Sequence, residues 1–210
     1  MSIAMKNIFL TITFFTILNS RAQTIFPLYK SDKEVHGAYY KDVDNDLSNF
    51  VGTWKYTNGT TSLTITLERK EMKNRTESLQ SLSYYEDVLI GGYRYIENGV
   101  EMINTLPLLS QNFANRYDYT IFGNTILSAA TTNCTGCSTI LRAVQLQFID
   151  PDREILGMDS KMYLARADSG GVQKLLLKFI LISGGLVEAG TTRPYDEYTV
   201  LFGDYLLVKQ

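Results

Sequence analysis

The chain has 210 residues, a formal net charge of −2 at pH 7, 45% hydrophobic residues and 20% charged residues. These values resemble those of average soluble domains, so they argue against a disordered chain and against a bundle of membrane helices. The length suits a single domain, and the slightly negative charge disfavours nucleic acid as a partner. The chain is rich in tyrosine and phenylalanine, and short alternating runs of Thr, Val and Ile favour β-strands.

Residues 1–22 have the pattern of a cleaved signal peptide. Lys6 supplies the positive start, and the apolar run that follows, residues 8–18, is shorter than the ~20 residues a membrane-spanning helix needs. Residues 20–22 then resemble a small-x-small cleavage site that would leave Gln23 first. We therefore expect a secreted or periplasmic protein with no membrane span in the mature chain, an uncleaved anchor being the alternative. No cysteine follows the apolar run, so a lipoprotein is not expected.

We interpret residues 23–48 as an extended lead-in that ends in a short helical turn capped by Asp46. Residues 42–46 also have the D-x-D-x-D opening of a calcium loop. An EF-hand needs Gly at the sixth position and Glu at the twelfth, where this chain has Leu47 and Thr53. A weaker calcium site and a solvated capping segment both stay open, and we assign no metal site.

Asn58-Gly59 predicts the first β-hairpin, because a two-residue Asn-Gly loop favours a type I′ turn. Closing the hairpin there pairs Tyr56 with Thr61 and Trp54 with Leu63. This pairing places the apolar side chains on one face of the hairpin and the polar ones on the other.

A second hairpin is predicted at Asn98-Gly99, with Tyr95 opposite Met102. Further turn signals stand at Gly123-Asn124, Asp150-Pro151-Asp152, residues 168–171 and Gly203-Asp204. Short strands separated by such turns predict that residues 49–210 form one all-β domain, an antiparallel meander closing into a barrel, or a partly closed barrel or sandwich. Residues 39–43 loosely resemble residues 84–88, but two copies are too few to predict a repeat architecture.

Cys134 and Cys137 are the only cysteines. In an exported protein such a pair most often forms a structural disulfide that closes a loop. A thioredoxin-like redox pair is the alternative, although the flanking residues resemble strand ends and not the helix N-terminus that this chemistry uses. A structural zinc site needs four ligands, which two cysteines and the sole histidine, His36, do not supply.

The sequence offers no set of residues for catalysis. A single histidine disfavours Ser-His-Asp and Cys-His arrangements. The carboxylate pairs Glu86-Asp87 and Asp150 with Asp152 stand in hydrophilic turns or strand starts, and we interpret them as surface charges. We therefore predict no enzyme, no catalytic residue, no metal and no cofactor.

Aromatic side chains are the best candidates for ligand contact, because their rings supply both apolar area and stacking faces. We select Trp54, Tyr56, Tyr93 and Tyr95 as possible ligand-binding residues. The alternative is that these rings pack the faces of the sheet.

Asn49-Phe50-Val51-Gly52-Thr53-Trp54 resembles the short Gly-x-Trp motif of lipocalin-like barrels. The resemblance implies a turn of helix before the first strand and a tryptophan that closes the base of the barrel. In those families an arginine from a late strand packs over the tryptophan, and Arg142 and Arg166 are both candidates for that role. The fold class expected is thus a lipocalin-like barrel.

Residues 40–72, 84–91 and 95–101 are similar to a family of exported Bacteroidota proteins, chiefly flavobacterial, of unknown function. The similarity implies bacterial export and no particular activity. Our leading hypothesis is an exported, non-enzymatic binding module that carries a small apolar molecule or a glycan in its barrel. The alternative is a structural or protein-interaction component of the cell envelope. An open interior would favour the first hypothesis and a filled core the second.

Overall fold

The computed structural model describes residues 23–28, 34–77, 81–127, 142–187, 190, 192 and 194–210. The strands are β1 (Ile25–Pro27), β2 (Tyr39–Lys41), β3 (Gly52–Asn58), β4 (Thr61–Glu77), β5 (Leu82–Glu97), β6 (Val100–Asn104), β7 (Ile121–Leu127), β8 (Ala143–Phe148), β9 (Asp159–Arg166), β10 (Lys174–Ser183) and β11 (Gly203–Lys209). Short 3-10 helices form η2 (Leu47–Phe50), η4 (Leu106–Gln111) and η5 (Arg116–Asp118). Among the described residues, no helix has the length and apolar character that crossing a membrane requires.

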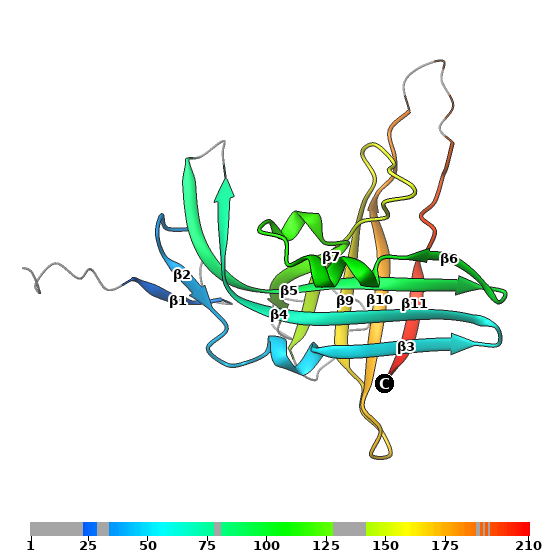
Figure 1. Cartoon of the computed structure of the whole chain (residues 1–210), viewed down its shortest axis with the longest axis horizontal. Helices are drawn as coiled ribbons and strands as arrows, with labels where there is room; N and C mark the ends of the chain where they lie inside the picture. The colour runs from blue at the N-terminus through cyan, green and yellow to red at the C-terminus, as the bar shows by residue number, and fades with distance from the viewer. Residues whose placement is uncertain are drawn as a thin grey trace, which may run out of the picture.

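A closed antiparallel barrel forms the body of the protein. Its strands follow the order β3-β4-β5-β7-β8-β9-β10-β11, and β11 pairs back with β3. In Figure 1 the ribbon of β3, β4 and β5 crosses the ribbon of β9, β10 and β11, so two curved sheets face each other. The fold prediction is confirmed in its closed form, an all-β barrel of the lipocalin-like kind with very little helix.

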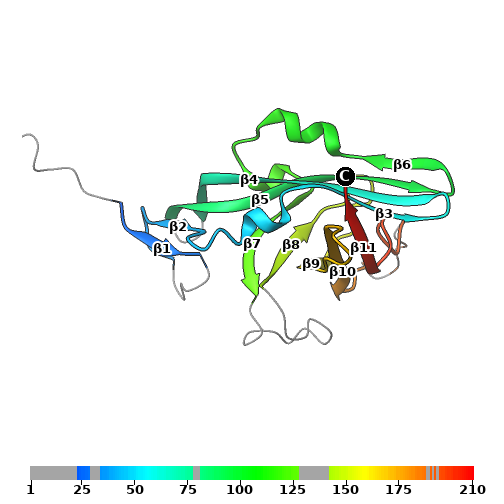
Figure 2. The ribbon, with the colours of Figure 1, turned by 90° about the horizontal axis from the view of Figure 1, so that it is seen from below.

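The long strand β5 organises the rest of the sheet. One edge pairs with β4, while the other pairs in turn with β2, β7 and β6. β2 and β5 run parallel, with Tyr39 opposite Tyr85, so the two similar segments noted in the sequence lie side by side. β1 and β2 therefore extend the sheet beyond the barrel (Figure 2).

The first hairpin turns one residue later than predicted, at Gly59-Thr60. Trp54 pairs with Ile65 and not with Leu63, a register shift of two residues. Asn58 remains in the strand, and only Gly59 has a positive φ, of 58°, whereas a type I′ turn needs positive φ at both central residues. Because side chains alternate with a period of two, this shift leaves the predicted inward face unchanged.

The second hairpin has the predicted turn, with positive φ at both Asn98 (51°) and Gly99 (82°). Its predicted pair was wrong, because a bulge near Met102 places Ile103 opposite Tyr95. Bulges of this kind add one residue to one strand and shift every later pair.

Two of the other predicted turns were wrong. Gly123 lies inside β7 at an irregularity, where a Cβ would stand only 2.9 Å from the Gln145 carbonyl oxygen. Gly203 begins β11. The turns at Pro151-Asp152 and Gly170-Gly171 are confirmed.

Side chains from all the barrel strands meet in one core. Its buried members include Trp54, Leu63, Leu89, Tyr93, Ile121, Val144, Met162, Leu175, Phe179 and Leu207. The loop before β11 adds Tyr198 and Val200 to the same cluster. A barrel of this size has an interior that side chains can fill, and these residues fill it where the structure describes it.

Candidate functional site

The four aromatic residues selected from the sequence all contact the barrel core. Trp54, Tyr93 and Tyr95 are buried members of it, and the half-buried Tyr56 packs against it. The Tyr56 ring stands edge-on to Tyr205, with ring centroids 5.0 Å apart. Burial raises the pKa of the Tyr93 hydroxyl above its ordinary value. The contacts of these rings are therefore made with the protein's own side chains.

Trp54 closes the base of the barrel. Its Nε1 donates a hydrogen bond to the Phe50 carbonyl oxygen (2.8 Å) in η2. Arg166 from β9 and Lys209 from β11 each lie 5.3 Å from the ring centre. Arg166 also donates to the Asn49 carbonyl oxygen (3.0 Å). Of the two arginines that the resemblance offered, Arg166 packs over the tryptophan.

The opposite end of the barrel is closed by an aromatic plug, which we define as Phe148, Phe179, Tyr198 and Phe202. Phe179 lies 4.7 Å from both Phe148 and Phe202, measured between ring centroids. The backbone N–H of Thr199 donates to the buried Asp150 carboxylate (2.6 Å), which holds the loop in place. Desolvation raises the pKa of Tyr198, as expected for a ring taken out of water.

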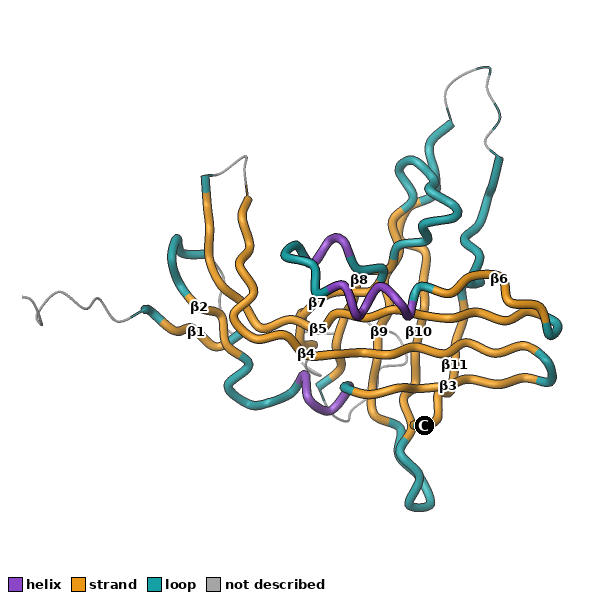
Figure 3. The backbone as a smooth tube through the Cα atoms, viewed as in Figure 1, coloured by secondary structure: helices purple, strands orange, loops and turns teal. Residues whose placement is uncertain are grey.

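An apolar surface lies beside this plugged end. The loops after β8 and β10 project from the same end of the barrel (Figure 3). These loops carry the exposed side chains Leu156 (77% exposed), Leu186 (67%) and Val187 (50%), and the end of β10 adds Ile182 (50%). We call these four residues the apolar tip. The backbone N–H of Leu186 donates to the Leu156 carbonyl oxygen (2.7 Å), so the two loops are joined at the tip.

The charged side chains around the apolar tip are mostly acidic. Three of those that are exposed form an acidic rim, which we define as Asp152, Glu154 and Glu197. Arg153 is the basic residue in these described loops, and its guanidinium lies 5.0 Å from the centre of the Tyr195 ring. It also donates to the carbonyl oxygens of Glu197 and Tyr198. The rim therefore presents negative charge around an apolar centre.

The D-x-D-x-D segment binds protein groups. The Asp42 carboxylate accepts the backbone N–H groups of Asp46 and Leu47 (both 2.9 Å), so Asp42 caps η2 and the predicted cap by the Asp46 side chain was wrong. Asp44 and Asp46 instead pair with Arg142. Within the part of the chain that the structure describes, no group of three acidic, His or Cys residues is arranged to hold a metal ion.

Three of the carboxylates interpreted as surface charges are buried. Asp87 accepts hydrogen bonds from the Tyr39 hydroxyl (2.6 Å) and from Arg69 (3.2 Å). Glu86 pairs with Arg116 (2.5 Å), and Asp150 holds the plug loop. The interpretation was wrong for these three, and a signal existed for two of them. Glu86 and Asp87 stand directly before an apolar run in β5, where a charged side chain needs buried partners.

The remaining sequence candidates carry little chemistry here. His36 is exposed, and its Nδ1 accepts the Ser83 backbone N–H (3.3 Å). Cys134 and Cys137, with their predicted disulfide, lie outside the described residues.

The chain belongs to a family of unknown function, DUF6705, which matches residues 5–210. No curated protein and no solved structure matches the chain. The family membership agrees with the resemblance found in the sequence in one respect, that the family's function is unknown, and it assigns neither a ligand nor an activity.

Proposed function

We propose that this protein is an exported, non-enzymatic binding module that uses its barrel as a rigid scaffold and docks a partner protein on the apolar tip. The observation that carries the proposal is the pairing of two exposed leucines, Leu156 and Leu186, at the end of a barrel whose interior is occupied. Contiguous apolar side chains rimmed by polar ones are typical of interaction sites. The signal-peptide pattern supports export.

A ligand inside the barrel, our leading hypothesis from the sequence, is less well supported. An apolar molecule or a glycan entering at the plugged end would have to displace Tyr198 and Val200, both of them buried. It would also have to break the hydrogen bond between Thr199 and Asp150. The interior side chains already contact one another, so a ligand would gain only contacts that the protein now makes with itself.

The acidic rim indicates what kind of partner fits. Negative side chains around an apolar centre attract a surface that has apolar side chains with lysine or arginine around them. The same charges repel the anionic headgroups of a membrane. We therefore identify the partner by its chemistry as a protein surface with an apolar centre and a basic border.

Site-specific crosslinking in the producing cells tests the proposal. A photoreactive amino acid replaces Leu156 or Leu186, and the control is Val172, an apolar residue of similar kind that is 42% exposed in the turn between β9 and β10. That turn lies at the other end of the barrel (Figure 1). We expect one defined protein adduct from the two tip positions and none from Val172. Identical adducts from all three positions, or none from the tip, would refute the proposal.

A further inference from the structure

β6 has an edge that no other described strand covers. It pairs with β5 alone and stands outside the closed ring of the barrel. In the antiparallel ladder the Thr105 backbone N–H donates to the Tyr93 carbonyl oxygen (2.7 Å). Alternate residues of such a ladder turn their N–H and C=O groups away from the partner strand. The backbone groups of Asn104 are therefore directed to the uncovered edge.

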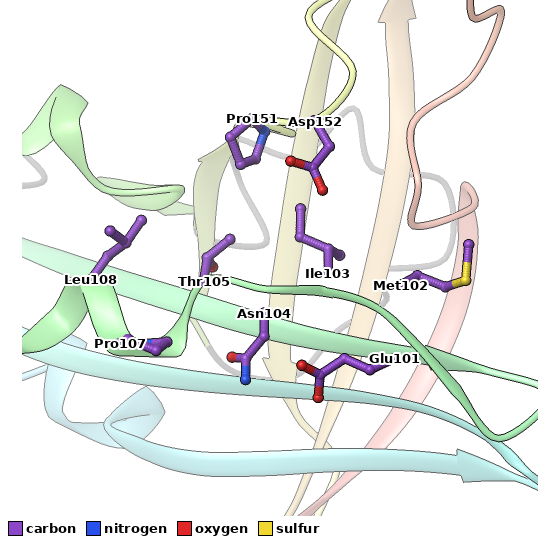
Figure 4. Close-up of a pocket in the computed structure, with 9 residues that line it drawn as sticks. All are labelled: Glu101, Met102, Ile103, Asn104, Thr105, Pro107, Leu108, Pro151 and Asp152. Carbon is purple, nitrogen blue, oxygen red and sulfur yellow. The ribbon is translucent and has the colours of Figure 1, made fainter.

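A groove runs along this edge. It has a volume of about 470 Å³ and is bounded by Glu101–Thr105 on one side and by Pro151 and Asp152 on the other (Figure 4). Ile103 and Asn104 point to opposite faces of the strand, yet both line the groove. This arrangement places the groove beside the strand and not on one of its faces. The volume lies within the usual range of binding pockets, roughly 300–1,000 Å³.

The groove and the apolar tip share a loop, because Asp152 belongs to the loop that also carries Leu156. Its charged lining residues, Glu101 and Asp152, are both acidic. Glu101 is already paired with Arg94, so Asp152 of the acidic rim contributes most of the uncompensated charge. Met102, which is 40% exposed, adds an apolar contact. The lining is thus a mixture of backbone, apolar and acidic groups.

We propose that β6 accepts an extended, basic segment of the partner protein as an added strand. Strand addition to an uncovered edge obtains its affinity from main-chain hydrogen bonds and its specificity from alternate side chains. Here the acidic lining selects lysine or arginine in the segment, and Met102 accepts an apolar neighbour. The inference rests on the proposed function, since it specifies how part of the partner protein is held.

A random dodecapeptide library displayed on phage and selected on the folded full chain provides the probe. We expect selected peptides to alternate basic and apolar residues and to slow hydrogen exchange at the backbone amide of Asn104. Asn104→Pro, which removes an edge N–H, is expected to weaken peptide binding by about tenfold or more. If that variant does not fold, Asp152→Lys makes the same test through charge, with Asp204→Lys as the control at an exposed acid on β11.

Each outcome distinguishes this inference from the proposed function. Leu186→Asp at the apolar tip should leave peptide affinity within about twofold, because the peptide lies along β6. Peptides that protect only the tip would overturn strand addition and leave docking on the tip intact. A dimer that forms in solution and is lost in Asn104→Pro would also overturn it, since a second copy of the chain would then occupy the edge. The crosslinking from Leu156 decides the proposed function independently.

Discussion

Replacing Phe179 with alanine measures whether the barrel interior is filled. The ring is fully buried and stands within 4.7 Å of Phe148 and Phe202, measured between centroids. Removing a buried phenylalanine ring costs about 3–5 kcal/mol, because the lost contacts and the remaining cavity add up. We expect Phe179→Ala to lower the free energy of unfolding by about 4 kcal/mol. Urea unfolding followed by the fluorescence of Trp54, the only tryptophan, provides the assay.

The matched control is Leu176→Ala on the same strand. Leu176 faces outward and is 39% exposed, so its removal should change the free energy of unfolding by about 0.5 kcal/mol or less. A loss below about 1.5 kcal/mol for Phe179→Ala would refute the reasoning, since it is far less than the cost of emptying a filled site.

Three further changes test the interactions that hold the scaffold together. Asp87→Ala removes the closer of the two buried carboxylates beside Arg69 and the acceptor of the Tyr39 hydroxyl. We expect a loss of about 3 kcal/mol in urea unfolding and faster hydrogen exchange at Tyr39. Arg166→Ala removes the cation over Trp54, with an expected loss of about 1–2 kcal/mol and a shifted emission maximum. Hydrogen bonds from the backbone N–H of Lys174 and from the Arg166 guanidinium lower the pKa of Asp168 below its ordinary value of 3.8. The ionised Asp168 carboxylate therefore stabilises the folded protein above pH 3.8, and this stabilisation is lost as the pH falls through the lowered pKa. Asp168→Asn should therefore reduce stability at neutral pH and flatten its decline in acid, as measured by unfolding at a series of pH values.

The controls are exposed residues of the same chemical types. Arg94→Ala breaks an ion pair whose two side chains are each 44% exposed, and such pairs contribute about 1 kcal/mol or less. An equal loss in Arg166→Ala and Arg94→Ala would argue against a special role for the cation over the tryptophan. Asp204→Asn is the comparison at an exposed acid on β11. An identical change in both Asp variants would contradict the assignment to Asp168.

The sequence predicted the inward face of the first hairpin but not its register. Alternation tells which side chains point inward, and a shift of two residues preserves that alternation. Trp54 is therefore inward both when paired with Leu63 and when paired with Ile65. The pattern alone does not distinguish the two pairings, and the turn conformation at Gly59 decides between them.

Closure of the barrel depends on contacts far apart in the chain. β5 pairs with β7 across an excursion that contains β6, η4 and η5, and Gly91 stands opposite Ile121. Local periodicity predicts where strands form, but it does not specify that β5 pairs with β7 as well as with β6, the next strand in the chain. The choice between Arg142 and Arg166 is of the same kind, because both positions suited the resemblance and only the packing over Trp54 separates them.

Among the candidate sites, the exposed loops were the least predictable. Leu156 stands in a loop that the turn signal at Asp150-Pro151-Asp152 marked only as a connection, and Leu186 stands in a loop for which no site was predicted. The apolar character of both resembled that of the neighbouring strands. The buried role of Asp150 depends on a hydrogen bond to Thr199, which is distant in sequence. The aromatic residues selected as possible ligand contacts are members of the core or, for Tyr56, pack against it.

Native mass spectrometry of the exported protein, purified without detergent, tests most directly whether the barrel is a scaffold or a container. A filled interior predicts the mass of the polypeptide alone, and no added mass after incubation with a panel of lipids and glycans. A bound apolar molecule or glycan whose retention is abolished by crosslinking the loop at Tyr198 to the barrel would contradict a filled interior, because the plug would then have opened to admit it.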